Sequence, residues 1–110
     1  MAMNTDYAPT EPTRAEIDAL EGAALIEFGS PDCGHCRAAQ ALIGQACAAH
    51  PQLRHLKIED GRGRALGRSF GVKLWPTLIF LSRGKEVERL VRPADAGAIA
   101  LALAWIDGAR

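Results

Sequence analysis

Four short apolar runs along the chain have the length and pattern of β-strands. The first, residues 23–28, is apolar except for Glu27, as expected of a strand covered by helices on both faces. Ser82-Arg83-Gly84-Lys85 has the composition of a hairpin turn between the last two runs. The predicted strands are residues 23–28, 53–58, 77–81 and 86–91.

Four other segments have helix-capping residues or helical periodicity. Thr13 and Glu16 form the pattern of a capping box, which predicts a helix that begins at Thr13 and ends by Gly22. The last segment carries an apolar stripe at helical spacing, with Leu101 and Trp105 beside it. The members of the stripe are Ile99, Ala102, Leu103 and Ile106. The remaining helices are predicted over residues 33–49, 64–70 and 94–107.

The predicted elements follow one another in the order α-β-α-β-α-β-β-α. This order is typical of an α/β domain with a central sheet flanked by helices on both faces. We expect parallel pairing through right-handed crossovers, and the terminal hairpin adds an antiparallel edge that makes the sheet mixed. The polar residues 1–12 are predicted to be flexible or weakly ordered, and residues 13–110 to form a single domain.

Composition and charge narrow the range of partners. Lys and Arg number 13, and Asp and Glu also number 13, so net charge gives no general attraction to nucleic acid or to an anionic membrane. The N-terminus lacks the basic and apolar regions of a signal peptide, and the apolar stretches are only long enough for strands. We therefore expect a cytoplasmic monomer that binds neither nucleic acid nor membrane.

The spacing of two cysteines indicates redox chemistry. Cys33-Gly34-His35-Cys36 follows a predicted buried strand and opens a predicted helix, whose N–H groups and dipole stabilise a thiolate at Cys33. Cys36 lies one turn further on, where it can resolve a mixed disulfide, and a protonated His35 adds positive charge beside the thiolate. Two ordinary buried cysteines, or half of a zinc site, are the alternatives. Zinc needs two more ligands, and the available residues are His35, His50, His55 and Cys47.

Several segments, in this order and spacing, resemble the thioredoxin family. They are Leu25-Ile26-Glu27-Phe28, Cys33-Gly34-His35-Cys36, Phe70-Gly71-Val72 and Trp75-Pro76-Thr77. The resemblance implies the thioredoxin fold and a thiol–disulfide oxidoreductase that needs no metal or organic cofactor. Its substrates would be disulfide-bearing protein clients or small-molecule disulfides, and its electrons would come from a reductase or from glutathione. The Cys-Gly-His-Cys sequence itself is more similar to protein disulfide isomerase, which suggests a less reducing dithiol.

The resemblance also implies roles for residues outside the dithiol. Pro76 would be a cis-proline that faces the cysteines and leaves the Trp75 backbone free to pair with a substrate peptide. A trans-proline that simply starts a strand is the alternative. Glu27 aligns with the buried acid beneath the thioredoxin dithiol and would relay a proton to or from Cys36. The alternative is an acid that reaches solvent or pairs with Lys57.

Departures from the family pattern fall on the surface that meets substrate. Asp32 stands where thioredoxin has a tryptophan, and it either opposes a thiolate at Cys33 or caps the helix. Trp75 is bulky for the residue before the proline, Arg92 replaces a glycine, and Ala41 replaces a helix-kinking proline. We expect the substrate-binding residues to be Trp75, Pro76, Asp32 and Arg92. These departures motivate an alternative function, a thioredoxin-fold binding or chaperone-like module with little turnover.

Three remaining features have simpler interpretations. Cys47 lies three turns beyond Cys36, about 16 Å away, so we expect a small core residue rather than a disulfide partner. His50 and His55 flank a helix–strand turn and are expected at the surface. The cluster of arginines predicts a solvated face, with an acidic client surface as the weaker option. Its members are Arg62, Arg64 and Arg68.

Overall fold

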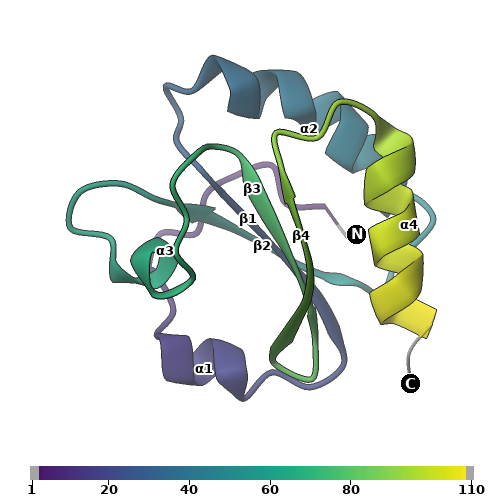
Figure 1. The fold of residues 1–110 in the computed structure, drawn as a ribbon, viewed down its shortest axis with the longest axis horizontal. Helices are drawn as coiled ribbons and strands as arrows, with labels where there is room; N and C mark the ends of the chain where they lie inside the picture. Colours follow the sequence, from purple (N-terminus) through teal and green to yellow (C-terminus); the bar gives the residue numbers. More distant parts are fainter. Residues whose placement is uncertain (1–2, 109–110) are drawn as a thin grey trace.

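The computed structural model describes residues 3–108 and contains four helices and four strands in the predicted order (Figure 1). The elements are α1 (Arg14–Asp18), β1 (Ala23–Gly29), α2 (Gly34–Cys47), β2 (Arg54–Glu59), α3 (Ala65–Ser69), β3 (Thr77–Ser82), β4 (Lys85–Val91) and α4 (Ala96–Gly108). Each lies within a few residues of its predicted range. Residues 1–2 and 109–110, which belong to the two predicted segments 1–12 and 13–110, lie outside the described residues.

The strands form a mixed sheet in the order β2-β1-β3-β4. β1 and β2 are parallel, as predicted, and the hairpin places β4 antiparallel to β3 at the edge. The expectation of parallel pairing is wrong for β3, which runs antiparallel to β1. The reason is the length of α3, because a helix of 5 residues advances only about 7 Å. The chain therefore stays at the end of the sheet where β1 and β2 finish, and β3 starts from there.

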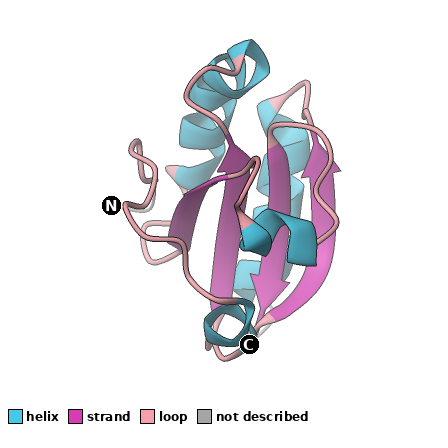
Figure 2. Ribbon diagram, turned by 90° about the vertical axis from the view of Figure 1, so that its left-hand side faces the viewer, coloured by secondary structure: helices cyan, strands magenta, loops and turns pink. Residues whose placement is uncertain are grey.

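Helices cover both faces of the sheet, as predicted. α2 and α4 pack on one face, and α1 and α3 pack on the other (Figure 2). Because successive side chains of a strand point to opposite faces, Leu25 packs in the α2–α4 layer and Ile26 in the α1–α3 layer. Glu27 shares the face of Leu25 and is fully buried. The alternation thus directs a carboxylate towards α2, the helix that carries the cysteine pair.

The ends and faces of the helices agree with the sequence signals. The Thr13 hydroxyl accepts from the Glu16 N–H at 3.1 Å, and the Glu16 carboxylate accepts from the Thr13 N–H at 2.8 Å, which completes the predicted capping box. The whole predicted stripe of α4 is buried, whereas Leu101 and Trp105 beside it are exposed. None of the helices within residues 3–108 is both long and apolar enough to cross a membrane.

Residues 4–8 lie beside β2 and form hydrogen bonds with it. The Ala8 N–H donates to the Lys57 carbonyl at 2.8 Å. The Asn4 N–H donates to the His55 ring at 2.7 Å, and the Asn4 side-chain amide donates to the His55 carbonyl. These contacts cover an edge strand that would otherwise present unpaired backbone groups.

The β3–β4 hairpin turn packs tightly against the end of α1. Gly84 adopts a φ of +77°, in the left-handed region, and a Cβ built on it would lie 2.1 Å from the Asp18 carbonyl oxygen. Glycine is required there for two separate reasons, its backbone conformation and the contact with α1.

Replacing Gly84 with alanine should lower the free energy of unfolding by about 3 kcal/mol or more, since left-handed strain adds to a backbone clash. Gly63→Ala is the matched control, because Gly63 has a φ of +78° but nothing within 4 Å of its Cβ position. It should cost only about 1–2 kcal/mol of backbone strain. Urea denaturation of both variants measures the difference. Equal decreases in the free energy of unfolding would show that the contact with α1 does not contribute to stability.

Candidate active site

Cys33 sits at the junction between β1 and α2, where it is the N-cap residue of the helix. Its sulfur accepts a hydrogen bond from the main-chain N–H of Cys36 at 3.1 Å. Its own N–H donates to the Ser30 carbonyl at 3.2 Å, which fixes the loop after β1. The unpaired N–H groups and the dipole of a helix stabilise negative charge at this end. The half-buried Cys33 thus lies at the positive end of the α2 dipole.

Cys36 is far less accessible than Cys33, with 2% of its surface exposed. A Cβ built on Gly29 would lie 2.7 Å from the Cys36 sulfur and 3.0 Å from the Tyr7 hydroxyl, so both groups pack against the bare end of β1. Burial raises the pKa of the Cys36 thiol to about 11, and its hydrogen bond with Cys33 adds to the rise. Burial also raises the pKa of Tyr7. The two thiols are therefore inequivalent, and both are free.

The loop before β3 lies against the exposed side of the dithiol. The Trp75–Pro76 peptide bond is cis. The Trp75 carbonyl oxygen lies 3.8 Å from the Cys33 sulfur and accepts a hydrogen bond from Arg92 Nε at 2.8 Å. Arg92 adopts a left-handed φ of 50°, the region that favours the glycine of the family pattern. The Trp75 carbonyl, expected to be free for substrate, thus already accepts one hydrogen bond from Arg92.

The indole of Trp75 is fixed by a residue that the sequence analysis did not single out. Trp75 Nε1 donates to Asp60 Oδ2 at 2.8 Å. Asp60 in turn packs against α3, since a Cβ on Gly67 would lie 2.1 Å from Asp60 Oδ1. Its position in the sequence could have identified Asp60 as a site residue. Asp60 directly follows β2, which ends at the same edge of the sheet as β1.

Glu27 lies at the centre of a buried polar network. Its carboxylate accepts from Gln40 Nε2 at 2.7 Å and lies 3.0 Å from His55 Nε2. Lys57 Nζ is 3.9 Å away and donates to Gln40 Oε1 at 2.9 Å. Gln40 Nε2 also donates to the Cys36 carbonyl at 2.9 Å, so one amide connects the network to the dithiol. Glu27 is paired with Lys57, but it does not reach solvent.

The expectation that His55 sits at the surface is wrong, because 2% of the residue is exposed. His55 and Lys57 are two residues apart on β2 and lie beside Leu25 and Glu27 in the register, so all four share the face that α2 covers. The Asn4 N–H donates to His55 Nδ1, which leaves the ring proton on Nε2 to be donated to Glu27. This period-2 spacing was the signal that could have identified His55.

His50 is also less exposed than expected. Its Nδ1 lies 2.6 Å from Asp107 Oδ2, so the pair joins the end of α2 to the end of α4. Both side chains are partly shielded from solvent, at 16% and 23% exposed. The physical reason is the packing of α4 beside α2, which a linear sequence pattern does not reveal.

Three further predicted site residues are His35, Arg92 and Asp32. His35 and Arg92 line a hollow of about 320 Å³ together with Leu42, Pro93 and Ala94. Asp32 is exposed and does not cap α2, because the N-cap position belongs to the next residue, Cys33. The interpretation of Asp32 as the helix cap is therefore wrong, because α2 begins one residue later than that interpretation requires.

Cys47 and Ala41 lie further along α2. Cys47 is buried in the core, as predicted, and burial raises the pKa of its thiol to about 11. Ala41 is exposed. Within residues 3–108, no group of three His, Cys, Asp or Glu side chains is placed to hold a metal ion.

Comparisons with known proteins agree with this geometry. The family model Thioredoxin matches residues 8–104. The thioredoxin of Chlamydia muridarum is 34% identical over 74 residues, which cover 67% of this chain and 72% of the relative. The human protein disulfide-isomerase A2 is 38% identical over 84 residues, covering 71% of this chain and 16% of that protein. The structure of reduced thioredoxin 2 from Pseudomonas aeruginosa superposes with a TM-score of 0.85 at 50% identity, covering 96% of this chain and 98% of the other.

The chain therefore belongs to the thioredoxin family. The helix-capped Cys33 beside a buried Cys36 is consistent with the chemistry of that family. The protein is a thiol–disulfide oxidoreductase.

Replacing His55 with leucine should lower the free energy of unfolding by about 2–4 kcal/mol, because the buried Glu27 carboxylate loses a donor. The double variant Glu27→Leu/His55→Leu should be less destabilised than the sum of its single variants, since no carboxylate is then left short of a partner. Denaturant titration of the four proteins in this cycle measures the coupling. Additive losses would mean that the two side chains do not stabilise each other.

Proposed function

We propose that Cys33 attacks the client disulfide and that Cys36 resolves the mixed disulfide that results. The Cys33 thiolate forms a bond to one client sulfur, and the other client sulfur leaves as a thiolate. Cys36, once deprotonated, attacks Cys33 and releases the second client thiolate. Two electrons pass from the protein dithiol to the client, and the Cys33–Cys36 disulfide that forms is then reduced again by a reductase or by glutathione.

The inequivalence of the two sulfurs is the observation that carries this assignment. Cys33 is half-buried at the helix N-terminus and accepts an N–H hydrogen bond. Cys36 is buried, and a pKa of about 11 keeps its thiol protonated at neutral pH. A nucleophile must be both ionised and reachable, and of the two thiols Cys33 meets these conditions better.

Glu27 is proposed to take the proton that Cys36 must lose. Gln40 contacts both the Glu27 carboxylate and the Cys36 carbonyl. A cavity of about 130 Å³ beside Cys36 is also lined by Gln40, Lys57 and Tyr7, and it has room for water molecules that carry a proton. The buried network would thus supply the base for the resolving step.

Substrate is proposed to bind along the exposed side of the dithiol. Trp75 and Pro76 support this role because the Trp75 carbonyl lies next to the Cys33 sulfur. The 320 Å³ hollow between His35 and Arg92 offers an apolar floor at Leu42 and Pro93. A protonated His35 would add positive charge near the thiolate, whereas the exposed Asp32 would oppose it. Clients are proposed to be disulfide-bearing proteins, met by a monomer in the cytoplasm as part of redox homeostasis.

A second candidate function is favoured by one contact. Because Arg92 donates to the Trp75 carbonyl, it would compete with a client backbone N–H for that oxygen. In a binding or chaperone-like module that rarely turns over, such competition for the Trp75 carbonyl would not impair function. Turnover assays distinguish this function from the first.

Cys33→Ser should reduce dithiothreitol-driven reduction of insulin to the uncatalysed rate, because no attacking thiolate remains. Cys36→Ser should accumulate a mixed disulfide with an insulin chain, seen as an added mass in intact-protein mass spectrometry. Cys47→Ser is the matched control, since that thiol lies in the core, and it should keep activity within about twofold of wild type. A wild-type rate no faster than the uncatalysed one would favour the binding module.

Arg92→Gly should raise kcat/KM for insulin about two- to fivefold, since it frees the Trp75 carbonyl for one more substrate hydrogen bond. It should also raise the free energy of unfolding by about 0.5–1 kcal/mol through relief of left-handed strain. Arg83→Gly is the control, because Arg83 has a similar φ of 53° but lies in the hairpin turn at the other end of the sheet. Equal rates in both variants would mean that Arg92 does not obstruct substrate.

A further inference from the structure

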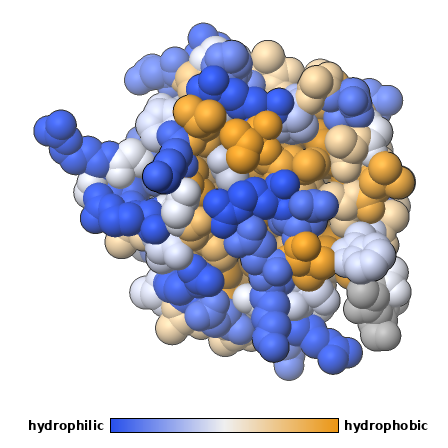
Figure 3. Space-filling view, in the orientation of Figure 1, coloured by the Kyte–Doolittle hydropathy of each residue, from blue (hydrophilic) through white to orange (hydrophobic). Residues whose placement is uncertain are grey.

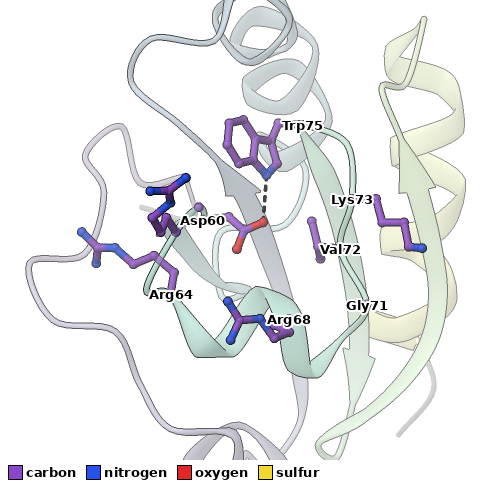
Figure 4. A pocket seen from close by; sticks show the side chains of 9 residues that line it. Asp60, Arg64, Arg68, Gly71, Val72, Lys73 and Trp75 are labelled. Carbon is purple, nitrogen blue, oxygen red and sulfur yellow. Dashed lines mark hydrogen bonds between the residues drawn. The ribbon is translucent and has the colours of Figure 1, made fainter.

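A second hollow lies on the other side of Trp75 from the dithiol. It has a volume of about 500 Å³ and lies between α3, the loop before it and the loop that leads to β3 (Figure 4). The Trp75 ring forms one wall, held by its hydrogen bond to Asp60, and Arg68 projects from α3 below (Figure 4). Val72 adds an apolar surface.

Positive charge dominates this hollow. Its lining includes four cationic residues and, among the described residues, a single carboxylate, Asp60, which is engaged by the Trp75 indole. The cations are Arg62, Arg64, Arg68 and Lys73. Arg64 lies 3.6 Å from Glu59. The other three side chains make no hydrogen bond or ion pair with any residue in the described part of the chain.

This local excess of charge stands out because the whole chain has equal numbers of acidic and basic residues. Hydrophilic side chains gather over α3 and the loop before it, at the left of Figure 3. Cations without intramolecular partners contribute little to folding, so their clustering in one hollow is better explained by an external anion.

The position of the hollow relates it to the chemistry. Trp75 belongs to both places, since its ring lines the hollow while its carbonyl lies 3.8 Å from the Cys33 sulfur. Asp60 and Gly67 hold the ring in place through close packing. A polypeptide with one sulfur at Cys33 therefore has a short route over Trp75 into the basic hollow.

We propose that the hollow receives an acidic segment of the client protein and so selects clients with Asp or Glu near the reacting disulfide. The inference rests on the proposed function, because it concerns which disulfides reach Cys33. A carboxylate meets the unpaired guanidinium groups, and the Trp75 ring packs against the neighbouring side chains of the client. Charge complementarity of this kind changes association rate and specificity more than the chemical step.

The test compares three peptide disulfides that differ only in the residues flanking the cysteine, which are acidic, neutral or basic. Wild-type protein should reduce the acidic peptide with a kcat/KM about fivefold higher than that of the neutral one at low ionic strength. The basic peptide should be the poorest substrate. Added salt should shrink the preference, because the charges lie at the surface.

The double variant Arg62→Gln/Arg68→Gln should lose most of the preference for the acidic peptide over the neutral one. Arg54→Gln/Arg83→Gln is the matched control, since it removes the same charge from the opposite end of the sheet, where β2 begins and β3 ends. It should retain the preference. Loss of preference in both double variants would show an effect of net charge alone and overturn the proposal.

Three further outcomes separate this inference from the proposed function. If wild-type protein reduces all three peptides equally well, the hollow has no role in selection, but the dithiol chemistry stands. If inorganic phosphate at low concentration abolishes reduction of the acidic peptide without slowing the neutral one, the hollow takes small anions, and a client segment is not its occupant. If none of the peptides is reduced above the rate of Cys33→Ser, the proposed function itself fails.

Discussion

A single hydrogen bond, from the main-chain N–H of Cys36 to the side-chain sulfur of Cys33, organises the redox site. It places one sulfur on the positive end of α2 and, through the same turn of helix, draws the other back against Gly29. A side chain at Gly29 would collide with that second sulfur. The end of a buried strand and the start of a helix thus produce two unlike thiols from two identical residues.

Different groups surround the redox site on its exposed side and on its buried side. On the exposed side, the loop that carries Trp75 lies against the Cys33 sulfur, and Arg92 donates to the Trp75 carbonyl. Beneath α2, Glu27 and His55 form a fully buried pair whose remaining hydrogen-bonding groups are satisfied by Gln40 and Asn4. Burying a carboxylate is unfavourable unless its partners are fixed, and here α2 supplies Gln40 while β2 supplies His55 and Lys57.

Local patterns in the sequence predicted most of the fold and the cysteine pair. The capping box at Thr13 and the buried stripe of α4 depend on neighbouring residues, so they can be read from one stretch of chain. The antiparallel pairing of β3 with β1 and the hydrogen bond from Trp75 to Asp60 join distant segments, and no local pattern specifies them. His55 was misjudged although its period-2 spacing with Lys57 places both on one face of β2, because the burial of that face depends on α2 lying over it.

The segment before α1 has a larger part in the site than its distance in sequence suggests. Asn4 sets the tautomer of His55, and Tyr7 lines the cavity beside Cys36 while its ring lies under Lys57 Nζ at 4.7 Å. Both residues reach these places because the segment pairs with β2 at Ala8. Detachment of this one stretch from the sheet edge would therefore expose both the buried Glu27–His55 pair and the Cys36 sulfur to water.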